Sequence, residues 1–305
     1  MSNYSIEGYG VALALRSTKT ILVEGPSDKR VLSRLILQHD IRNNRRTRFL
    51  IDEVALISND QTLARKGNKE KVEIIASTLE SLSSKFNWLV DREWDGVDLE
   101  ANPIEFYPPP ARPWGRHTKG HSIENYWFRD KFLLNYLRMF FGDTLKVEFF
   151  STLSERFDSI IRIAAAYSFA SKKLGTLSRS IGLLKAAHIE WIEGRYIACQ
   201  SLNAALRARG CNEDVATEVN NELGRNTIQS SSTAALQWLC HGHLGEEMIR
   251  ACAAQLAFEF NYSNEIVEAI ERGARTEKMA HDADCLAELD IEQVEPLGDL
   301  ISWLE

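Results

Sequence analysis

Short apolar runs alternate with helical patterns through the first part of the chain, and this alternation constrains the fold more than any other feature of the sequence. The apolar run Thr20–Val23 precedes a segment with apolar residues at helical spacing, and the run Phe86–Val90 follows another such segment. Strands and helices in this order form a parallel sheet with crossover connections. The sequence therefore predicts an α/β domain over residues 1–130, with a parallel sheet and flanking helices.

The individual elements follow from hydrophobic periodicity and from turn residues. In the first domain we expect strands at Thr20–Val23, Phe49–Ile57, Phe86–Val90 and Ile104–Tyr107. We expect one helix from about Ser27 and a second at Lys69–Leu82. After about residue 130, long amphipathic segments dominate and proline is nearly absent. We therefore expect a mainly helical second domain over residues 131–305, with helical segments at Phe132–Phe141, Leu153–Phe169, Ile181–Leu206 and Glu246–Phe260.

The charge of the chain is divided unevenly between these two parts. Residues 1–130 contain 19 Lys and Arg against 18 Asp and Glu, a balance of +1, whereas residues 131–305 contain 17 against 25, a balance of −8. Basic surface attracts a polyanion and acidic surface repels it. A phosphate-binding surface is therefore expected in the first part, and a protein-binding surface in the second.

Composition also bears on the cellular location. No apolar stretch reaches the roughly 18–20 residues of a membrane span, and the first residues lack the basic and then apolar pattern of a signal peptide. The five cysteines are odd in number and form no CxxC pair, which favours reduced thiols over a disulfide framework. We expect a cytoplasmic protein without membrane contact.

Carboxylates follow two of the expected strands directly. Glu24 comes after the first strand, and Asp91, Glu93 and Asp95 come after the third. Ligands of open α/β sheets bind at the carboxyl ends of the strands, and residues 91, 93 and 95 would point to one side of an extended segment. Two interpretations stay open: these carboxylates bind a Mg²⁺ or Mn²⁺ ion together, or they are solvated turn residues.

Basic residues that could contact a phosphate backbone occur at the start of the first helix, in an arginine-rich run, before the second helix and after a proline-rich segment. These candidates are Lys29, Arg30, Arg45, Arg46, Lys66, Arg116 and Lys119. Cationic side chains hold phosphates by charge-assisted hydrogen bonds. The alternative interpretation is a set of solvated surface residues and polar connections.

The carboxylate motifs resemble those of a known family. Val23-Glu24-Gly25 after one strand and Val90-Asp91-Arg92-Glu93 after a later strand are similar to the Toprim domain of primases, topoisomerases and OLD-type nucleases. The family pattern is a Glu followed later by Asp-x-Asp, and Glu93 replaces the second Asp here. The segment Ser122–Tyr126 resembles the "SIENY" signature of stand-alone Toprim proteins of phage defence. Among these, the chain looks most like the Toprim nuclease subunits of PARIS systems.

This resemblance implies a Mg²⁺-dependent endonuclease that acts as a toxin in antiviral defence and cleaves RNA, with tRNA as the expected substrate. It implies catalytic and metal-binding roles for Glu24, Asp91 and Glu93, with Asp95 as a compensating ligand. Glu124 and Asn125 are shared with the family without an assigned role. It also implies an ABC-type ATPase partner that keeps the nuclease inactive, and a homodimer as the active form. The sequence itself contains no GxxxxGK[ST] motif for ATP, so the ATPase would be another protein.

Two alternatives to this function remain. The Toprim core could be a docking or regulatory subunit that does not catalyse, an interpretation favoured by the departure at Glu93. It could also be a nuclease that cuts DNA, as OLD-type nucleases do.

Overall fold

The computed structural model describes residues 3–102, 104–106, 115–273, 275–289 and 294–305. The chain forms two compact units, each assembled from separate stretches of sequence. The first unit contains Met1–Arg92, Pro109–Ile123 and Met279–Glu305, and the second contains Glu93–Pro108 and Glu124–Lys278. This division differs from a single boundary at residue 130, because the stretch after the third strand belongs to the second unit and the last stretch belongs to the first. Across the described residues, no helix is both long and apolar enough to cross a membrane.

A parallel sheet of four strands, counted over the described residues, forms the centre of the first unit and confirms the predicted fold class. The strand order is β2-β1-β3-β6, and all three pairings are parallel. β1 and β3 are mostly apolar and almost fully buried, as parallel strands with both faces covered usually are. The strands are β1 (Lys19–Val23), β2 (Phe49–Glu53), β3 (Phe86–Val90) and β6 (Arg116–His117).

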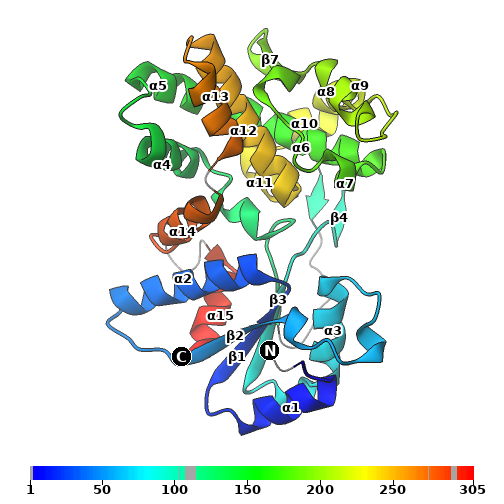
Figure 1. Cartoon of the computed structure of the whole chain (residues 1–305), viewed down its shortest axis with the longest axis vertical. Coiled ribbons are helices and arrows are strands. Elements are labelled where there is room, and N and C mark those ends of the chain that lie inside the picture. Colours follow the sequence, from blue (N-terminus) through cyan, green and yellow to red (C-terminus); the bar gives the residue numbers. More distant parts are fainter. Residues whose placement is uncertain (1–2, 103, 107–114, 274, 290–293) are drawn as a thin grey trace. The chain divides into compact units, whose positions relative to one another are not determined.

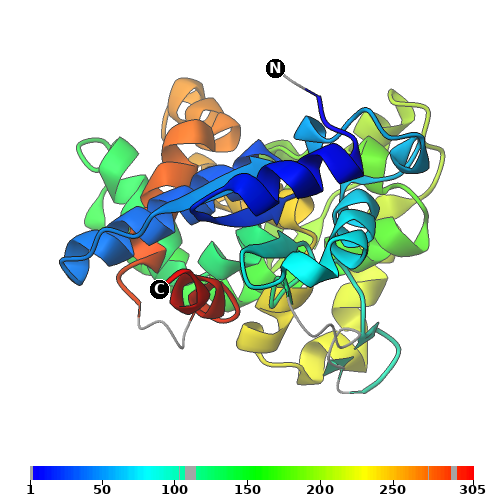
Figure 2. The same ribbon diagram turned by 90° about the horizontal axis from the view of Figure 1, so that it is seen from below.

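Helices cover both faces of this sheet. Leu22, Phe86, Trp88 and Val90 face a core shared with α1 (Ile6–Leu15) and α3 (Asn68–Thr78). Figure 1 shows α2 (Pro26–Arg42) on the opposite face, and Figure 2 shows α1 in front of the strands. Short 3₁₀ turns complete the connections at η1 (Val54–Leu56), η2 (Gln61–Leu63) and η3 (Glu80–Leu82).

Helix α1 lies outside the elements expected from the sequence. The Ser5 hydroxyl caps it by accepting the Gly8 N–H at 3.1 Å, and the buried residues Ile6, Tyr9 and Leu13 line one face of it. A buried polar cluster joins this helix to the sheet: the Tyr9 hydroxyl donates to Asp52 at 3.0 Å, and Arg16 binds the same carboxylate. Burial and the Asp52 charge raise the pKa of Tyr9 well above its usual value.

The strand expected at Ile104–Tyr107 is not part of the parallel sheet. Glu105–Phe106 forms β5, which pairs antiparallel with β4 (Val97–Asp98) in the second unit, and Tyr107 lies outside the described residues. The fourth parallel strand is β6 instead. It begins after Gly115, where φ is +84° and a Cβ would lie 1.9 Å from the Trp88 ring, so a residue without a side chain lets the backbone approach β3.

The second unit is a helical assembly around two buried helices. Residues 163–171 of α6 (Phe157–Lys173) and 251–257 of α12 (Gly242–Glu259) are buried without interruption, as expected for helices at the centre of a bundle. The surrounding helices are α4 (Asp130–Phe141), α5 (Val147–Glu155), α7 (Leu177–Ser180), α8 (Ser201–Arg207), α9 (Val215–Gly224), α10 (Asn226–Ser230), α11 (Thr233–Leu239) and α13 (Asn264–Arg272). The turn η5 (Ala186–His188) also belongs to this unit. The turn η4 (Ile123–Trp127) and helix α14 (Arg275–Leu286) each contain residues of both units, and the last helix, α15 (Leu297–Leu304), belongs to the first.

A β-hairpin replaces part of the helix expected at Ile181–Leu206, and that prediction is wrong. Strands β7 (Ile189–Ile192) and β8 (Arg195–Ala198) pair antiparallel around Glu193 and Gly194, whose φ angles are 50° and 79°. Two consecutive positive φ angles match the two-residue turn that joins hairpin strands. The Glu193-Gly194 pair is the sequence signal for this hairpin, because glycine readily adopts the positive φ that the turn requires.

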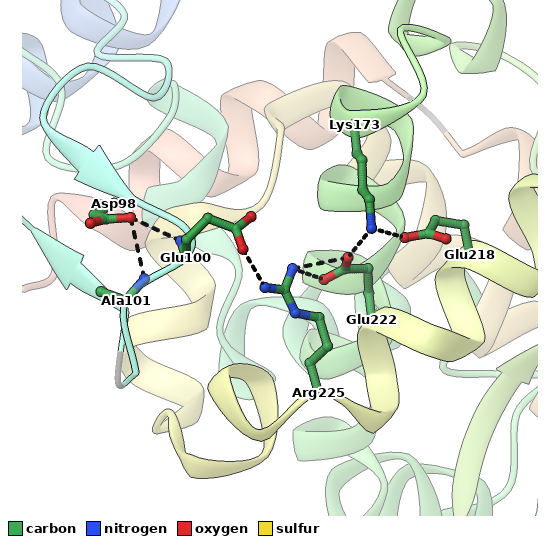
Figure 3. Close-up of polar contacts among 7 residues, drawn as sticks. All are labelled: Asp98, Glu100, Ala101, Lys173, Glu218, Glu222 and Arg225. Atoms are coloured by element: carbon green, nitrogen blue, oxygen red, sulfur yellow. Dashed lines mark hydrogen bonds and ion pairs between the residues drawn. The ribbon is translucent and has the colours of Figure 1, made fainter.

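A chain of ion pairs fixes the β4–β5 segment to α9 within the second unit (Figure 3). Arg225 binds Glu100 at 2.6 Å and both carboxylate oxygens of Glu222 at 3.1 Å. Lys173 lies 3.6 Å from Glu222 and 2.6 Å from Glu218. Glu222 is only 1% exposed, so its charge depends on these two cations for stabilisation.

Replacing Glu222 by glutamine should lower the free energy of unfolding by about 1–3 kcal/mol, because the buried ion pairs are lost and Arg225 keeps only its exposed partner. Urea denaturation at pH 7 followed by circular dichroism measures this difference. Glu218→Gln on the same helix is the matched control, with an expected loss of about 0–1 kcal/mol because its pair with Lys173 is at the surface. Equal losses in the two variants would contradict a structural role for the buried carboxylate.

Candidate active site

The two carboxylates predicted at strand ends meet at one edge of the sheet. β1 ends at Val23 and β3 at Val90, and the two strands are parallel neighbours with Val23 opposite Leu89. The Glu24 carboxylate accepts the Asp91 N–H at 2.7 Å. The convergence of Glu24 and Asp91 that the sequence predicted is therefore present within the first unit.

Backbone and side-chain hydrogen bonds hold Asp91 and its neighbour in place. The Asp91 carboxylate accepts the Ile123 N–H at 3.2 Å. The Arg92 N–H donates to the Thr118 hydroxyl at 2.9 Å, and that hydroxyl donates to the Gly120 carbonyl at 2.8 Å. The chain that follows β6 thus fixes the end of β3, and the first residue of the Ile-Glu-Asn-Tyr segment contributes through its backbone.

Two helices begin beside Glu24. Gly25 is the N-cap of α2, where the Asp28 carboxylate accepts the Gly25 N–H at 3.1 Å. At the start of α3, the Asn68 side chain donates to the Glu24 carbonyl at 3.2 Å, and Lys69 donates to the Arg92 carbonyl at 2.9 Å. The N-terminus of a helix carries partial positive charge, so both helices favour negative charge at this edge.

Residues 91–95 are not extended, and the prediction that residues 91, 93 and 95 share one side by alternation is wrong. Residues 93–96 form a turn, with φ of 56° at Glu93 and 67° at Gly96. The turn closes with a hydrogen bond from the Val97 N–H to the Trp94 carbonyl at 3.2 Å. Glu93 and Asp95 belong to the second unit, whereas Glu24 and Asp91 belong to the first.

Glu93 and Asp95 surround a lysine of their own unit. The Lys172 ammonium lies 4.4 Å from the centre of the Trp94 ring. Burial lowers the pKa of Lys172, while the charges of Asp95 and Glu93 oppose that shift. The two carboxylates therefore favour the charged form of Lys172, and their roles as metal ligands stay predictions.

Glu124 and Asn125, which the sequence resemblance marks as shared with Toprim proteins, lie in the second unit and are buried. Glu124 is 3.7 Å from His243 at the start of α12. The side-chain amide of Asn125 donates to the backbone carbonyls of Gln237 and Cys240 at 2.7 and 2.9 Å. The backbone carbonyl of Asn125 accepts from the side-chain amide of Gln237 at 2.8 Å. Asn125 therefore satisfies backbone groups at the end of α11, which is a structural role.

The predicted basic residues are dispersed over the first unit. Lys29 pairs with Glu53 at 3.3 Å and Arg116 with Asp299 at 3.1 Å, and Lys66 pairs with Glu70. Arg45 and Arg46 line a hollow with Lys19, the first residue of β1, and Arg45 also pairs with Glu305. Arg30 and Lys119 are exposed. The two arginines therefore lie near the amino ends of the strands, at the edge opposite Glu24 and Asp91.

Sequence reasoning missed two further polar groups at the carboxyl edge. Glu53 is the last residue of β2 and lies opposite Val23 in the register. Thr118 directly follows β6 and is buried. Glu53 had a weaker signal than Glu24, since Asp52 separates it from the apolar run Phe49–Ile51, whereas a two-residue strand gives Thr118 no detectable pattern.

The chemistry of the Glu24–Asp91 pair suits Mg²⁺, which takes one or two carboxylates and completes its coordination with water and substrate phosphates. In the part of the chain that the structure describes, no group of three or more His, Cys, Asp or Glu residues could hold a metal ion. A metal at this edge would therefore be held by Glu24 and Asp91, with its remaining ligands supplied by water and substrate.

No protein-family model matches the sequence, and no curated protein sequence is significantly similar to it. The resemblance to Toprim proteins therefore rests on the short motifs alone.

The junction of α11 and α12, beside Trp94, should be sensitive to pH through His241. Burial and the neighbouring His243 lower the pKa of His241 to about 4. Between about pH 6.5 and pH 4 the unfolded chain binds a proton at this histidine that the folded chain does not bind. The folded state should therefore lose about 2–3 kcal/mol as the pH falls through this window.

Urea denaturation of wild type and His241→Gln at pH 7.5, 5.5 and 4.5 measures this contribution. We expect the variant to show a shallower loss of stability on acidification than wild type. His243→Gln, which alters a more exposed ring, should keep most of the wild-type slope. A wild-type slope in His241→Gln would contradict the assignment to His241.

Proposed function

We propose that this protein is a Mg²⁺-dependent endonuclease of the Toprim type, acting as a toxic effector in anti-phage defence and cleaving RNA, with tRNA as the preferred substrate. The observation that carries the proposal is the contact between Glu24 and Asp91 at the carboxyl edge of adjacent parallel strands. This edge is where open α/β sheets bind their ligands.

The residues of the chain have separate tasks in this proposal. Glu24 and Asp91 would hold the metal ion, and a bound metal would supply positive charge next to the scissile phosphate and the attacking water. The hydrogen bonds of Asp91 to Glu24 and Ile123 fix both carboxylates on the backbone, so little reorganisation is needed when substrate binds. The N-termini of α2 and α3 favour the negative charge of the phosphate at the same edge.

The charge distribution supports a small structured RNA over long duplex DNA as the substrate. Residues 1–130 have a balance of +1, and the affinity for long polyanions rises with the number of phosphates that a protein neutralises. The second unit, residues 93–108 and 124–278, contains 18 Lys and Arg against 24 Asp and Glu, a balance of −6. This acidic balance favours protein contacts, which we assign to an ABC-type ATPase partner and to a second copy of the chain. The protein is proposed to act in the cytoplasm.

A second candidate function is favoured by the same hydrogen bonds. Glu24 and Asp91 each accept a backbone N–H, so the pair also ties the ends of β1, β3 and the segment at Ile123 together. In a docking or regulatory subunit this structural task would be sufficient for both residues. Isosteric substitutions separate the two functions, because they keep the hydrogen bonds and remove the charge.

Glu24→Gln and Asp91→Asn should each reduce cleavage by about a hundredfold or more, because a neutral amide replaces a carboxylate of the proposed metal site. The assay incubates the purified chain with total tRNA, and separately with supercoiled plasmid, in Mg²⁺ or Mn²⁺. Faster cleavage of tRNA than of plasmid is expected. Calorimetric titration with Mn²⁺ should show weaker binding to both variants than to wild type.

The matched control is Glu53→Gln, which changes a carboxylate of the neighbouring strand end that pairs with Lys29. This variant should cleave and bind Mn²⁺ like wild type. Wild-type cleavage by Glu24→Gln would refute the proposed site. A chain that neither binds Mn²⁺ nor cleaves either substrate, while remaining folded, would favour the docking function.

A further inference from the structure

We propose that a cavity in the second unit binds a linear organic cation, with ammonium or guanidinium groups on an aliphatic chain. The cavity has a volume of about 610 Å³ and lies between α12, α13 and the η5–β7 segment. This volume is within the range of roughly 300–1,000 Å³ that holds small-molecule ligands. All of its lining residues belong to the second unit, so the inference does not depend on the proposed nuclease activity.

One part of the lining is apolar and includes an exposed aromatic ring. Ile189 and Val267 are buried, whereas Phe258 near the end of α12 is 62% exposed although it lines the cavity. An aliphatic chain would bury itself against the two branched side chains. The face of a phenylalanine ring also attracts a cation within about 6 Å of its centre.

The charged part of the lining has an excess of carboxylates. Glu190, Glu259, Glu268 and Glu271 line the cavity with a single cation, Lys185, which gives an excess of three negative charges. Glu259 is paired with Arg156 outside the cavity at 2.7 Å, and Glu271 accepts the Ala186 N–H at 2.6 Å. Within the described residues Glu268 has no such ion pair or hydrogen bond, so its charge is available to an incoming cation.

Gln255 gives an independent indication that the proposed ligand carries a hydrogen-bond donor. This side chain lines the cavity and is only 9% exposed. Its amide nitrogen donates to Glu259 at 2.9 Å, but its buried carbonyl oxygen has no hydrogen-bond partner among the described residues. A buried acceptor without a donor is unfavourable, and a rotation of the Gln255 side chain toward the cavity would let a ligand N–H satisfy it. Carboxylates, an unsatisfied carbonyl and an aromatic face together recognise an amine and reject an anion.

The test is calorimetric titration of the full chain with α,ω-diaminoalkanes of four to eight carbons and with the matching diols. Saturable binding of the diamines at one site, and no binding of the diols, is expected. Lysine capped as an N-acetyl methylamide carries the same ammonium on a peptide backbone. The capped lysine should bind more weakly than the best diamine. Tighter binding of the capped lysine would show that the cavity recognises a lysine side chain of a peptide, and it would overturn the proposal of a free linear cation.

Glu268→Gln and Gln255→Leu should each weaken diamine binding by about tenfold, because each removes a polar partner of the cation. Glu265→Gln is the matched control: it makes the same change at an exposed position of α13 that does not line the cavity. It should change the affinity by less than about twofold. Equal weakening by Glu265→Gln and Glu268→Gln would show that diamines are attracted diffusely to acidic surface, and this result would overturn the proposal. Equal binding of diols and diamines would also overturn it, and so would the absence of diamine binding. The exposed Glu268 variant keeps the test decisive if Gln255→Leu unfolds.

Discussion

The parallel pairing of β1 with β3 is the constraint on which the first unit depends. It places the ends of both strands at one edge of the sheet, with Val23 opposite Leu89. Asp91 is the first residue beyond β3. Its N–H donates to the Glu24 side chain at the point where the backbone hydrogen bonds between β1 and β3 end. The position of the Glu24 carboxylate is therefore set by the sheet itself. A carboxylate held in this way is ordered before any ligand arrives, which suits it to a binding or catalytic role.

The two edges of this sheet carry opposite chemistry. Acidic groups gather at the carboxyl edge, where Glu53 ends β2 beside Glu24 and Asp91. The arginine run gathers near the amino edge, beside Lys19. A five-residue strand separates these edges by about 13 Å or more. A nucleic acid bound at the carboxylates would thus meet the arginine run only through a distant part of its backbone. In the proposed nuclease, the helix N-termini beside Glu24 would consequently be the closer source of attraction for the substrate phosphate.

Sequence patterns predicted the parts of the fold in which burial is continuous. β1 and β3 are short, largely apolar runs, and Phe86–Val90 was located to the residue because both faces of the strand are covered. Two-residue strands such as β4, β5 and β6 are too short for any periodicity. The hairpin at β7–β8 was missed because the turn at Glu193-Gly194 was not weighed against helical spacing.

Which segments of the chain belong to each unit could not be inferred from local sequence patterns, for a different reason. The return of the C-terminal stretch to the first unit depends on contacts between residues far apart in the sequence. Arg34 binds Asp284 at 2.7 Å, and Arg116 binds Asp299 at 3.1 Å. A surface charge gives no local sign of its distant partner. The same limit applies to the candidate site, where Glu24 and Asp91 were predicted from strand ends but Thr118 depends on how the chain folds back after β6.

Glu93 is the position at which local structure and the proposed chemistry compete. Its φ of 56° is costly for a residue other than glycine, and asparagine or aspartate tolerates this region better than glutamate does. Backbone conformation would thus favour the Asp of the Toprim pattern over the Glu found here. Attraction to Lys172 offers a reason for the longer side chain, since the charge of Glu93 opposes the effect of burial on that lysine. Asp95 and Glu93 both act within the second unit, where their charges oppose the lowering of the pKa of Lys172, a cation that lies over the Trp94 ring.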